Sequence, residues 1–261
     1  MLQRFRKDMI RYWPYVAANA KARLKAEVAG SYLNWLWWII NPLSFMLIYT
    51  FIFGVVFHAA EPYFPLYVFI GLTVWDFFSH VLVQSVQSVK NNRFILSSVY
   101  LPKYMLTVAD MLINGLKLLV SFGIVALMML FYRVPLGWNT LLVLPALLGL
   151  ALFTFGLSNL MLHAGVYVRD LVSVINIALR LLFYLTGIFY DIEKRLPPPF
   201  HKLVLRFNPM AVFITQTRDA LLFRQSAHTR LLLLWIGLSA LLAAASIRVI
   251  YAHENDYVKV I

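Results

Sequence analysis

Cysteine is absent from the 261 residues, which excludes disulfide bonds, thiol catalysis and thiolate metal sites. Charge is scarce as well. Only 13% of the residues are charged and 62% are hydrophobic, whereas about a quarter of the residues of a soluble domain are charged. The composition therefore predicts an integral membrane protein.

Familiar enzymatic motifs are also missing. The sequence contains no G-x-x-x-x-G-K-[ST], no H-E-x-x-H and no G-x-S-x-G, the patterns of phosphate-binding loops, zinc proteases and serine hydrolases. We therefore expect no catalytic residue, no metal and no cofactor bound by this chain. Any energy for its activity has to come from a partner protein.

Long apolar runs are the dominant feature that is present. A helix needs about 20 predominantly apolar residues to cross a bilayer. Six stretches meet this requirement, at about 41–58, 64–88, 106–131, 139–163, 171–190 and 229–250. They leave no room for a soluble domain, so the sequence predicts an all-α membrane protein with six transmembrane helices in a single domain over residues 1–261.

Basic residues indicate the orientation, because loops rich in Lys and Arg stay in the cytoplasm. Seven basic residues precede the first span, and the second-to-third and fourth-to-fifth loops carry four more. On the opposite side, the first two loops carry only Arg133. A multi-pass protein with both termini in the cytoplasm is therefore expected.

One outer segment breaks this rule, since residues 191–229 carry six basic residues. A helix over 196–207 is about 18 Å long, too short to cross about 30 Å of hydrocarbon. Asn208 and Pro209 suit the cap and first turn of a second helix. We expect an outer re-entrant hairpin over 196–224, with a plain surface loop as the alternative. Its apolar face, resting on the bundle or the outer leaflet, would consist of Phe200, Leu203, Val204 and Phe207.

Two segments on the cytoplasmic side are suited to contact. Within residues 1–40, apolar residues recur every four positions beside basic ones, which predicts an amphipathic helix along the inner headgroups. The loop over 91–104 predicts a short helix that exposes apolar and aromatic side chains to a docking partner. A loop folded back on the lipid surface is the alternative. The side chains expected to be presented are Arg93, Phe94, Ser97, Tyr100 and Leu101.

Four ionisable residues fall inside the predicted spans: Asp76, Asp110, Lys117 and Arg180. A charge at that depth is costly unless it is paired, and the spacing allows an ion pair of Asp76 with Lys117 or Arg180. A structural pair or the wall of a wet cavity is one interpretation, and a proton or ion relay is the other.

Aromatic residues follow the whole first span at intervals of four, and others lie in later spans. Sugars stack their C–H faces on such rings, so the row could line a path for a glycan; packing or lipid contact is the alternative. The rings considered for the path are Phe45, Tyr49, Phe53, Phe57 and Tyr184.

Three short motifs occur in a recognisable order: "LWWIINPL" before the first span, "YVRDL" before the fifth and "FNPM" before the sixth. With the basic entry helix, the loop over 91–104 and the proline-rich outer segment, this order resembles the permease subunits of ABC exporters that move lipid-linked polysaccharides. These substrates are O antigens, capsules and wall teichoic acids. The likeness extends over nearly the whole chain.

The resemblance implies a homodimer in a bacterial cytoplasmic membrane, joined to separate ATPase subunits that hold ATP and magnesium. It implies that the loop over 91–104 is a coupling helix, that the hairpin over 196–224 is a gate, and that the aromatic row belongs to a glycan channel. The expected partners are membrane lipid and a lipid-linked glycan or teichoic acid, and no nucleic acid. The headgroup would enter beside Lys21, Arg23 and Lys25.

Two other classes of function are kept as alternatives. An ion-coupled secondary transporter would use Asp76, Asp110 and Lys117, and its transport would follow an ion gradient without an ATPase. A membrane transferase acting on a lipid-linked sugar would turn over in detergent without a partner.

Overall fold

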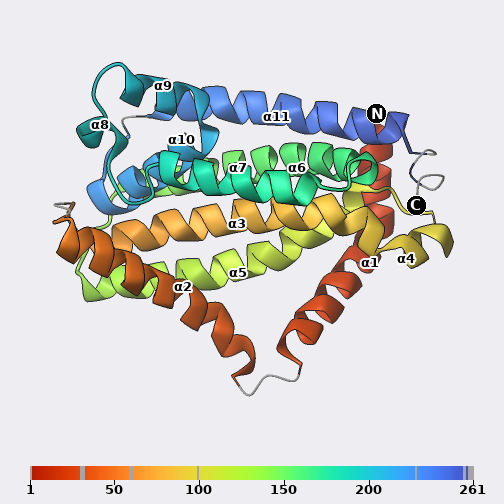
Figure 1. The fold of residues 1–261 in the computed structure, drawn as a ribbon, viewed down its shortest axis with the longest axis horizontal. Coiled ribbons are helices and arrows are strands. Elements are labelled where there is room, and N and C mark those ends of the chain that lie inside the picture. Colours follow the sequence, from red (N-terminus) through yellow and green to blue (C-terminus); the bar gives the residue numbers. More distant parts are fainter. Residues whose placement is uncertain are drawn as a thin grey trace.

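The structure, a computed structural model, describes residues 2–29, 33–58, 61–98, 100–226, 228–254 and 257. All regular secondary structure among these residues is helical, which confirms the predicted all-α class. The α-helices, drawn in Figure 1, are α1 (Leu2–Val28), α2 (Trp37–Tyr49), α3 (Phe64–Asn91), α4 (Arg93–Ser98), α5 (Tyr104–Phe131), α6 (Val143–Tyr167), α7 (Leu171–Leu185), α8 (Ile192–Arg195), α9 (Phe200–Phe207), α10 (Pro209–Arg218) and α11 (Thr229–Ala252).

Tighter or wider helical turns extend several of these helices. Short 3₁₀ turns precede α2 and α6, over Asn34–Leu36 and Trp138–Leu142. Wider π-helical turns follow α2 and α10, over Thr50–Val56 and Asp219–Phe223.

Five helices in the described residues are long and apolar enough to cross a membrane: α2 with its π-helical extension, α3, α5, α6 with its preceding turn, and α11. The predicted span over 171–190 is different, because α7 has only 15 residues. That length gives about 22 Å, short of the roughly 30 Å hydrocarbon core. The helix ends where Gly187 takes a φ of +75°, a left-handed conformation that terminates helices. The predicted span over 171–190 therefore stays a prediction.

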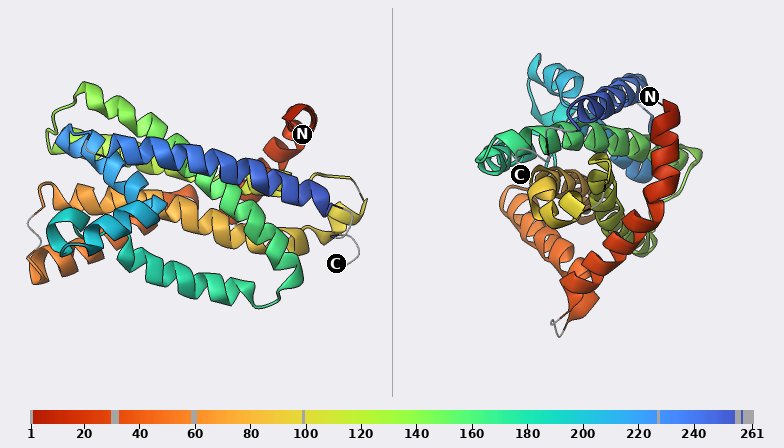
Figure 2. Two further views of the ribbon diagram at one scale, coloured as in Figure 1. Left: turned by 90° about the horizontal axis from the view of Figure 1, so that it is seen from above. Right: turned by 90° about the vertical axis from the view of Figure 1, so that its right-hand side faces the viewer.

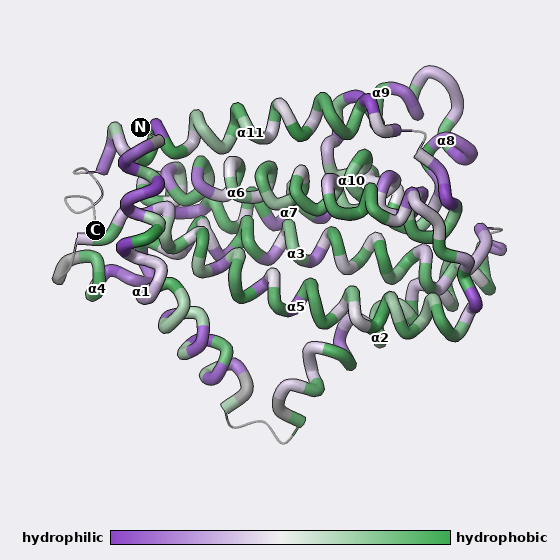
Figure 3. Tube along the Cα trace, turned by 180° about the vertical axis from the view of Figure 1, so that it is seen from behind, coloured by the Kyte–Doolittle hydropathy of each residue, from purple (hydrophilic) through white to green (hydrophobic). Residues whose placement is uncertain are grey.

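The long helices run side by side along one axis, with α3 in the middle (Figures 1 and 2). Helix α3 packs against α5 and α6, and α6 also packs along α11. Hydrophobic residues fill the middle of these helices, whereas hydrophilic residues gather on α1 and around α8 and α9 (Figure 3). The arrangement follows from the need to bury apolar surface while polar side chains stay at the ends.

Helix α1 crosses the side of the bundle and packs on α5, and α1 and α2 converge away from the bundle (Figure 1). Two members of its predicted apolar stripe, Val16 and Ala20, are buried. That stripe therefore faces protein in this structure. The first span also begins earlier than expected: Pro42 lies inside α2, which starts at Trp37.

The two ends of the bundle carry different features. Helix α4 lies at the same end as the start of α1 and the end of α11, and helices α8 to α10 lie at the other end (Figure 1). The distribution of Lys and Arg predicts that the α4 end faces the cytoplasm. The restart at Asn208 is confirmed, since its Oδ1 accepts a hydrogen bond from the N–H of Ala211 (3.2 Å) and Pro209 opens α10.

Candidate functional site

The aromatic residues of α2 form one continuous row with rings from α7 and the turn after it. Ring centroids of Tyr49 and Phe53 both lie 4.5 Å from that of Phe189. In α2 the ring of Phe45 lies 6.4 Å from that of Tyr49, and in the π-helical extension and just after it the rings of Phe53 and Phe57 lie 5.7 Å apart. The structure therefore brings together four residues predicted for the glycan path.

Tyr184, the fifth predicted member, joins this row from α7. Its ring lies 6.2 Å from Phe189 and 5.3 Å from Phe183. The middle rings of the row, Tyr49 and Phe53, are half-buried, whereas Phe45 and Tyr184 are exposed. A row that is covered only in part leaves ring faces available to a ligand.

Two hollows lie along the row. The first has a volume of about 450 Å³ and includes Tyr49 and Tyr184, and the second has about 470 Å³ and includes Phe53 and Phe57. The first is also lined by Trp75, Phe183, Ser79, His80, Val83, Gln84, Asn176, Leu179 and Arg180. The second is also lined by Glu61, Phe189, Tyr190, Arg195 and Leu196. Rings beside a few polar groups suit a ligand with both apolar faces and hydrogen-bonding groups.

Most of the polar residues that line the first hollow were not singled out from the sequence, although their spacing in the sequence could have indicated them. Asp76, His80 and Gln84 recur every four residues on α3, and Asn176 and Arg180 continue to Tyr184 at the same spacing on α7. Polar residues at this spacing share one face of a helix. In an apolar span, such a face indicates a wet or ligand-facing surface.

The intramembrane charges are paired differently from the prediction. Lys117 Nζ lies 2.7 Å from Glu27 on α1, and Asp110 accepts hydrogen bonds from Arg23 on α1 and from Ser88 Oγ (2.7 Å). In the part of the chain that the structure describes, Asp76 forms no ion pair with Lys117 or Arg180, so the pair that the spacing allowed is not formed there. The partners come from α1, whose sequence gave no sign of lying against α5.

A smaller hollow of about 180 Å³ between α2, α3 and α5 contains Asp76, His80, Asn114 and Lys117. His80 also lines the first hollow beside the aromatic row. Of the three residues of the ion-coupled alternative, Asp76 and Lys117 therefore line one hollow, and Asp110 and Lys117 are paired with residues of α1.

Arg23 has a different environment from its neighbours on α1. Lys21 and Lys25 are exposed, as expected for residues that meet a headgroup. The Arg23 side chain is only 38% exposed because it reaches Asp110, whose side chain is 0% exposed. A fully buried carboxylate needs a counter-charge, so the structure engages Arg23 in the bundle instead of leaving it for the headgroup.

The structure exposes some side chains of the predicted docking loop and buries another. Arg93 is exposed and the side chain of Phe94 is 84% exposed, as expected. Leu101 is only 2% exposed, since it packs with Val16, Tyr104 and other buried residues at this end. Its predicted exposure is therefore wrong. The side chain of Ser97 falls outside the described residues.

Tyr100 in the same loop is held by a hydrogen-bonded group. Arg4 Nη2 donates to the Tyr100 hydroxyl (2.8 Å) and to Glu254 Oε2 (2.7 Å), and the Tyr100 hydroxyl donates to Glu254. Burial and the hydrogen bond to Glu254 raise the pKa of Tyr100 to about 12. The Arg4–Tyr100–Glu254 group thus ties the docking loop to both the start of α1 and the end of α11.

Most of the predicted apolar face of α9 is exposed in this chain. Phe200, Leu203 and Phe207 are exposed, whereas Val204 is half-buried and packs against the cluster of Leu205, Ile192 and Ala211. Leu205, which is buried in that cluster, is the anchor of α9. Contact of the three exposed side chains with the outer leaflet stays a prediction.

Helix α10 is anchored by Arg218, one of the six basic residues of the outer segment over 191–229. Its side chain is buried between α10, α3 and the turn after α7. Nε donates to Tyr67 O (2.9 Å), Nη1 to Gly187 O (2.8 Å) and Nη2 to Ile188 O (2.7 Å). The guanidinium also lies 3.7 Å from the centre of the Tyr67 ring. Three carbonyls and a ring thus satisfy this buried cation.

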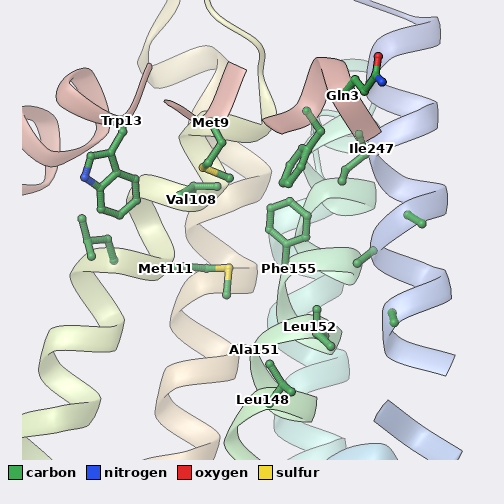
Figure 4. A pocket seen from close by; sticks show the side chains of 15 residues that line it. Gln3, Met9, Trp13, Val108, Met111, Leu148, Ala151, Leu152, Phe155 and Ile247 are labelled. Atoms are coloured by element: carbon green, nitrogen blue, oxygen red, sulfur yellow. The ribbon is translucent and has the colours of Figure 1, made fainter. Parts of the chain in front are cut away.

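A larger hollow, of about 940 Å³, lies beneath the first half of α1 (Figure 4). Its walls are apolar, with Met9, Trp13, Met111 and Phe155 among them, and Gln3 is their polar member. Its lining, as far as the structure describes the chain, includes none of the predicted site residues. Such a wall suits hydrocarbon and offers a glycan few hydrogen bonds, so the aromatic row is the better candidate site.

Comparisons with known proteins agree with the sequence motifs. Residues 14–222 match the model of a family described as the ABC-2 type transporter. Two proteins of Klebsiella pneumoniae, each named O-antigen export system permease protein RfbA, are 27% and 29% identical over 197 residues, 75% of each chain. A protein of the same name from Myxococcus xanthus is 26% identical over 209 residues, 80% of each chain.

Proposed function

This chain belongs to the ABC-2 type transporter family, and on that premise we propose that it is the membrane-spanning subunit of an ATP-driven exporter of a lipid-linked polysaccharide or teichoic acid. Two copies of the chain, in a bacterial cytoplasmic membrane, would join separate ATPase subunits that bind ATP and magnesium. The observation that carries the proposal is the row of aromatic rings on α2 that connects two hollows.

The row suits a moving sugar chain for a physical reason. Aromatic faces stack on the C–H faces of sugars without demanding one fixed hydrogen-bond geometry, so a polymer can slide from ring to ring. Polar groups such as Gln84 and Asn176 in the first hollow offer hydrogen bonds to hydroxyls. Weak contacts repeated along a path favour movement over tight capture.

Energy would enter at α4. The exposed ring of Phe94 is suited to a cleft of the ATPase subunit, since buried aromatic residues are common anchors of interfaces. Through the Arg4–Tyr100–Glu254 group, a displacement of this loop would reach α1 and α11 together. The exposed Lys21 and Lys25 on α1 would attract the pyrophosphate of the lipid carrier. On the opposite side, the α9–α10 hairpin would serve as the gate.

The test uses vesicles that contain this chain and the separate ATPase subunit that the proposal requires. Replacing Phe94 and Tyr100 together with alanine should abolish ATP-dependent export and co-purification with the ATPase, while insertion in the membrane is kept. Phe131→Ala is the matched control, because this ring is equally exposed but lies at the opposite end of α5. Export that persists in the double variant, or that follows an ion gradient without ATP, contradicts the proposal.

A further inference from the structure

Arg180 differs from the other basic residues that lie deep in the helices. It is the tenth residue of α7, about 14 Å from the start of that helix. Lys117 has Glu27 as a partner, Arg23 has Asp110, and Arg218 has three carbonyls. Within the described residues, Arg180 forms no ion pair, and its side chain is exposed in the first hollow of the aromatic row.

The surroundings of Arg180 favour a negative ligand. Among the residues that the structure describes, no carboxylate lines the first hollow, and the other titratable side chains that line it are His80, Tyr49 and Tyr184. The nearest carboxylate along α3, Asp76, lines the neighbouring hollow with Lys117. His80 Nδ1 donates to the backbone oxygen of Asp76 (2.8 Å), so this ring is also fixed beside the hollow. The described side chains that line the first hollow therefore carry a net positive charge.

The second hollow, at the other end of the row, is lined by one arginine, Arg195, and one carboxylate, Glu61. Glu61 Oε2 accepts a hydrogen bond from Lys194 Nζ (2.7 Å), and the same Nζ lies 3.1 Å from Asp191 Oδ2. The charges around this hollow therefore balance, so the first hollow, with Arg180, is the positive end of the row.

We propose that Arg180 binds a carboxylate or phosphodiester of the exported polymer, so that this exporter handles an acidic glycan or polyol phosphate in preference to a neutral one. The planar guanidinium matches both groups, because its parallel N–H bonds can donate to two oxygens at once. Asn176, one turn before Arg180 on α7, lines the same hollow and can donate to a neighbouring hydroxyl. This inference rests on the proposed function and names its class of substrate.

Binding of three oligomers to the complete complex, held in nanodiscs of phosphatidylcholine, tests the inference. The probes are a hexamer of galacturonate, the matching neutral hexamer of galactose and a hexamer of glycerol phosphate. The complex should bind at least one acidic hexamer about tenfold or more tightly than the neutral one. Arg180→Gln should weaken acidic binding by about 10- to 100-fold, the usual effect of losing a charged hydrogen bond. Neutral binding should change by less than about twofold.

Two further variants separate binding from folding. Arg180→Lys keeps the charge but loses the planar pair of donors, so it should retain part of the acidic preference. Arg248→Gln removes an exposed arginine from α11, outside both hollows, and should leave all three affinities unchanged. Equal loss of acidic and neutral binding in Arg180→Gln would assign the residue a structural role and overturn the inference.

Two outcomes would overturn the inference about Arg180 without contradicting the proposed function. The first is an unaltered complex that hydrolyses ATP and exports its native polymer but binds the neutral hexamer as tightly as the acidic ones. The second appears when phosphatidylglycerol is added to the nanodiscs: displacement of the acidic hexamers by this lipid, dependent on Arg180, would assign the arginine to a lipid headgroup. An unaltered complex without ATP hydrolysis would instead contradict the proposed function itself.

Discussion

Helices α2 and α3 are both apolar enough to span a membrane, yet they are buried inside the chain to very different extents. In α3, 78% of the most apolar stretch is buried inside the chain, whereas only 6% is buried in α2. Helix α3 supplies the centre of the core, and α2 lies at the edge and carries the aromatic row. The comparison teaches that apolar character places a helix in the membrane but does not determine its depth within the bundle.

The close approach of neighbouring atoms to α3 explains part of the difference in burial between α3 and α2. Where α6 crosses α3, a Cβ on Gly165 would lie only 2.3 Å from Val86 O. On α3 itself, a Cβ on Gly71 would lie 2.2 Å from Arg218 Nη2. In α2, the described residues include one buried side chain, Met46. Substitutions should therefore disturb the fold through the contacts of α3 and disturb function through α2.

The largest effect is expected at the anchor of α10 on α3. Arg218→Met would leave the carbonyls of Gly187 and Ile188 without these donors and remove the contact with the Tyr67 ring. We expect a loss of about 4 kcal/mol in the free energy of unfolding, or roughly 8 to 16 °C in the Tm of the purified chain. Arg206→Met, which changes an exposed arginine on α9, should lower the Tm by far less.

The same anchor can be broken from the α3 side. Gly71→Ala places a methyl group where Arg218 Nη2 lies, so it should also lower the Tm. Gly123→Ala on α5 meets open space and should be neutral or stabilise by up to about 1 kcal/mol, because alanine favours the helix. Equal Tm values for the two alanine variants would show that Arg218 is not held as the structure has it.

The next effect concerns the ion pair between α1 and α5, and it should be asymmetric. Arg23→Met leaves the fully buried Asp110 without its counter-charge and should cost about 3 kcal/mol. Asp110→Asn leaves Arg23 partly in contact with solvent and keeps an acceptor for Ser88, so about 1 kcal/mol is expected. Thermal denaturation of both variants checks the order, and the reverse order would place Asp110 in contact with water.

A smaller effect on stability, but a larger one on transport, is expected in α2. Phe53→Leu removes the stacked contact with Phe189 and should cost about 1 kcal/mol of stability. Export in vesicles should fall by about tenfold, since the ring joins the two hollows. Phe131→Leu removes an exposed ring of α5 far from the row and serves as the control. Unchanged export in Phe53→Leu would assign the row to packing.

The smallest effect is expected at Lys194, which is 60% exposed and paired with Glu61. Lys194→Ala should lower the free energy of unfolding by less than about 1 kcal/mol, and 1 M salt should remove the difference. The hydrogen bond to Glu61 raises the pKa of Lys194, so this contribution is complete below the ordinary lysine pKa of about 10.4 and is lost as the pH rises through the raised value. A Tm difference that persists at high salt would contradict this assignment.

Local sequence information was sufficient for features that depend on neighbours in the chain. The all-α class, five of the long spans and the restart of a helix at Asn208 follow from apolar run length, helical spacing and capping chemistry. The family also followed from short motifs in their order along the chain. These features need no knowledge of which helix packs on which.

Tertiary structure alone decided the features that join distant parts of the chain. Glu27 instead of Asp76 pairs with Lys117, and Leu101 is covered by residues of α1 and α5, because α1 packs across α5. Leu205, outside the predicted apolar stripe, anchors α9. Periodicity identifies the faces of a helix but not the neighbour of each face. In a membrane an apolar face can meet either lipid or protein at little difference in free energy, so only the packing of the whole bundle determines which one it meets.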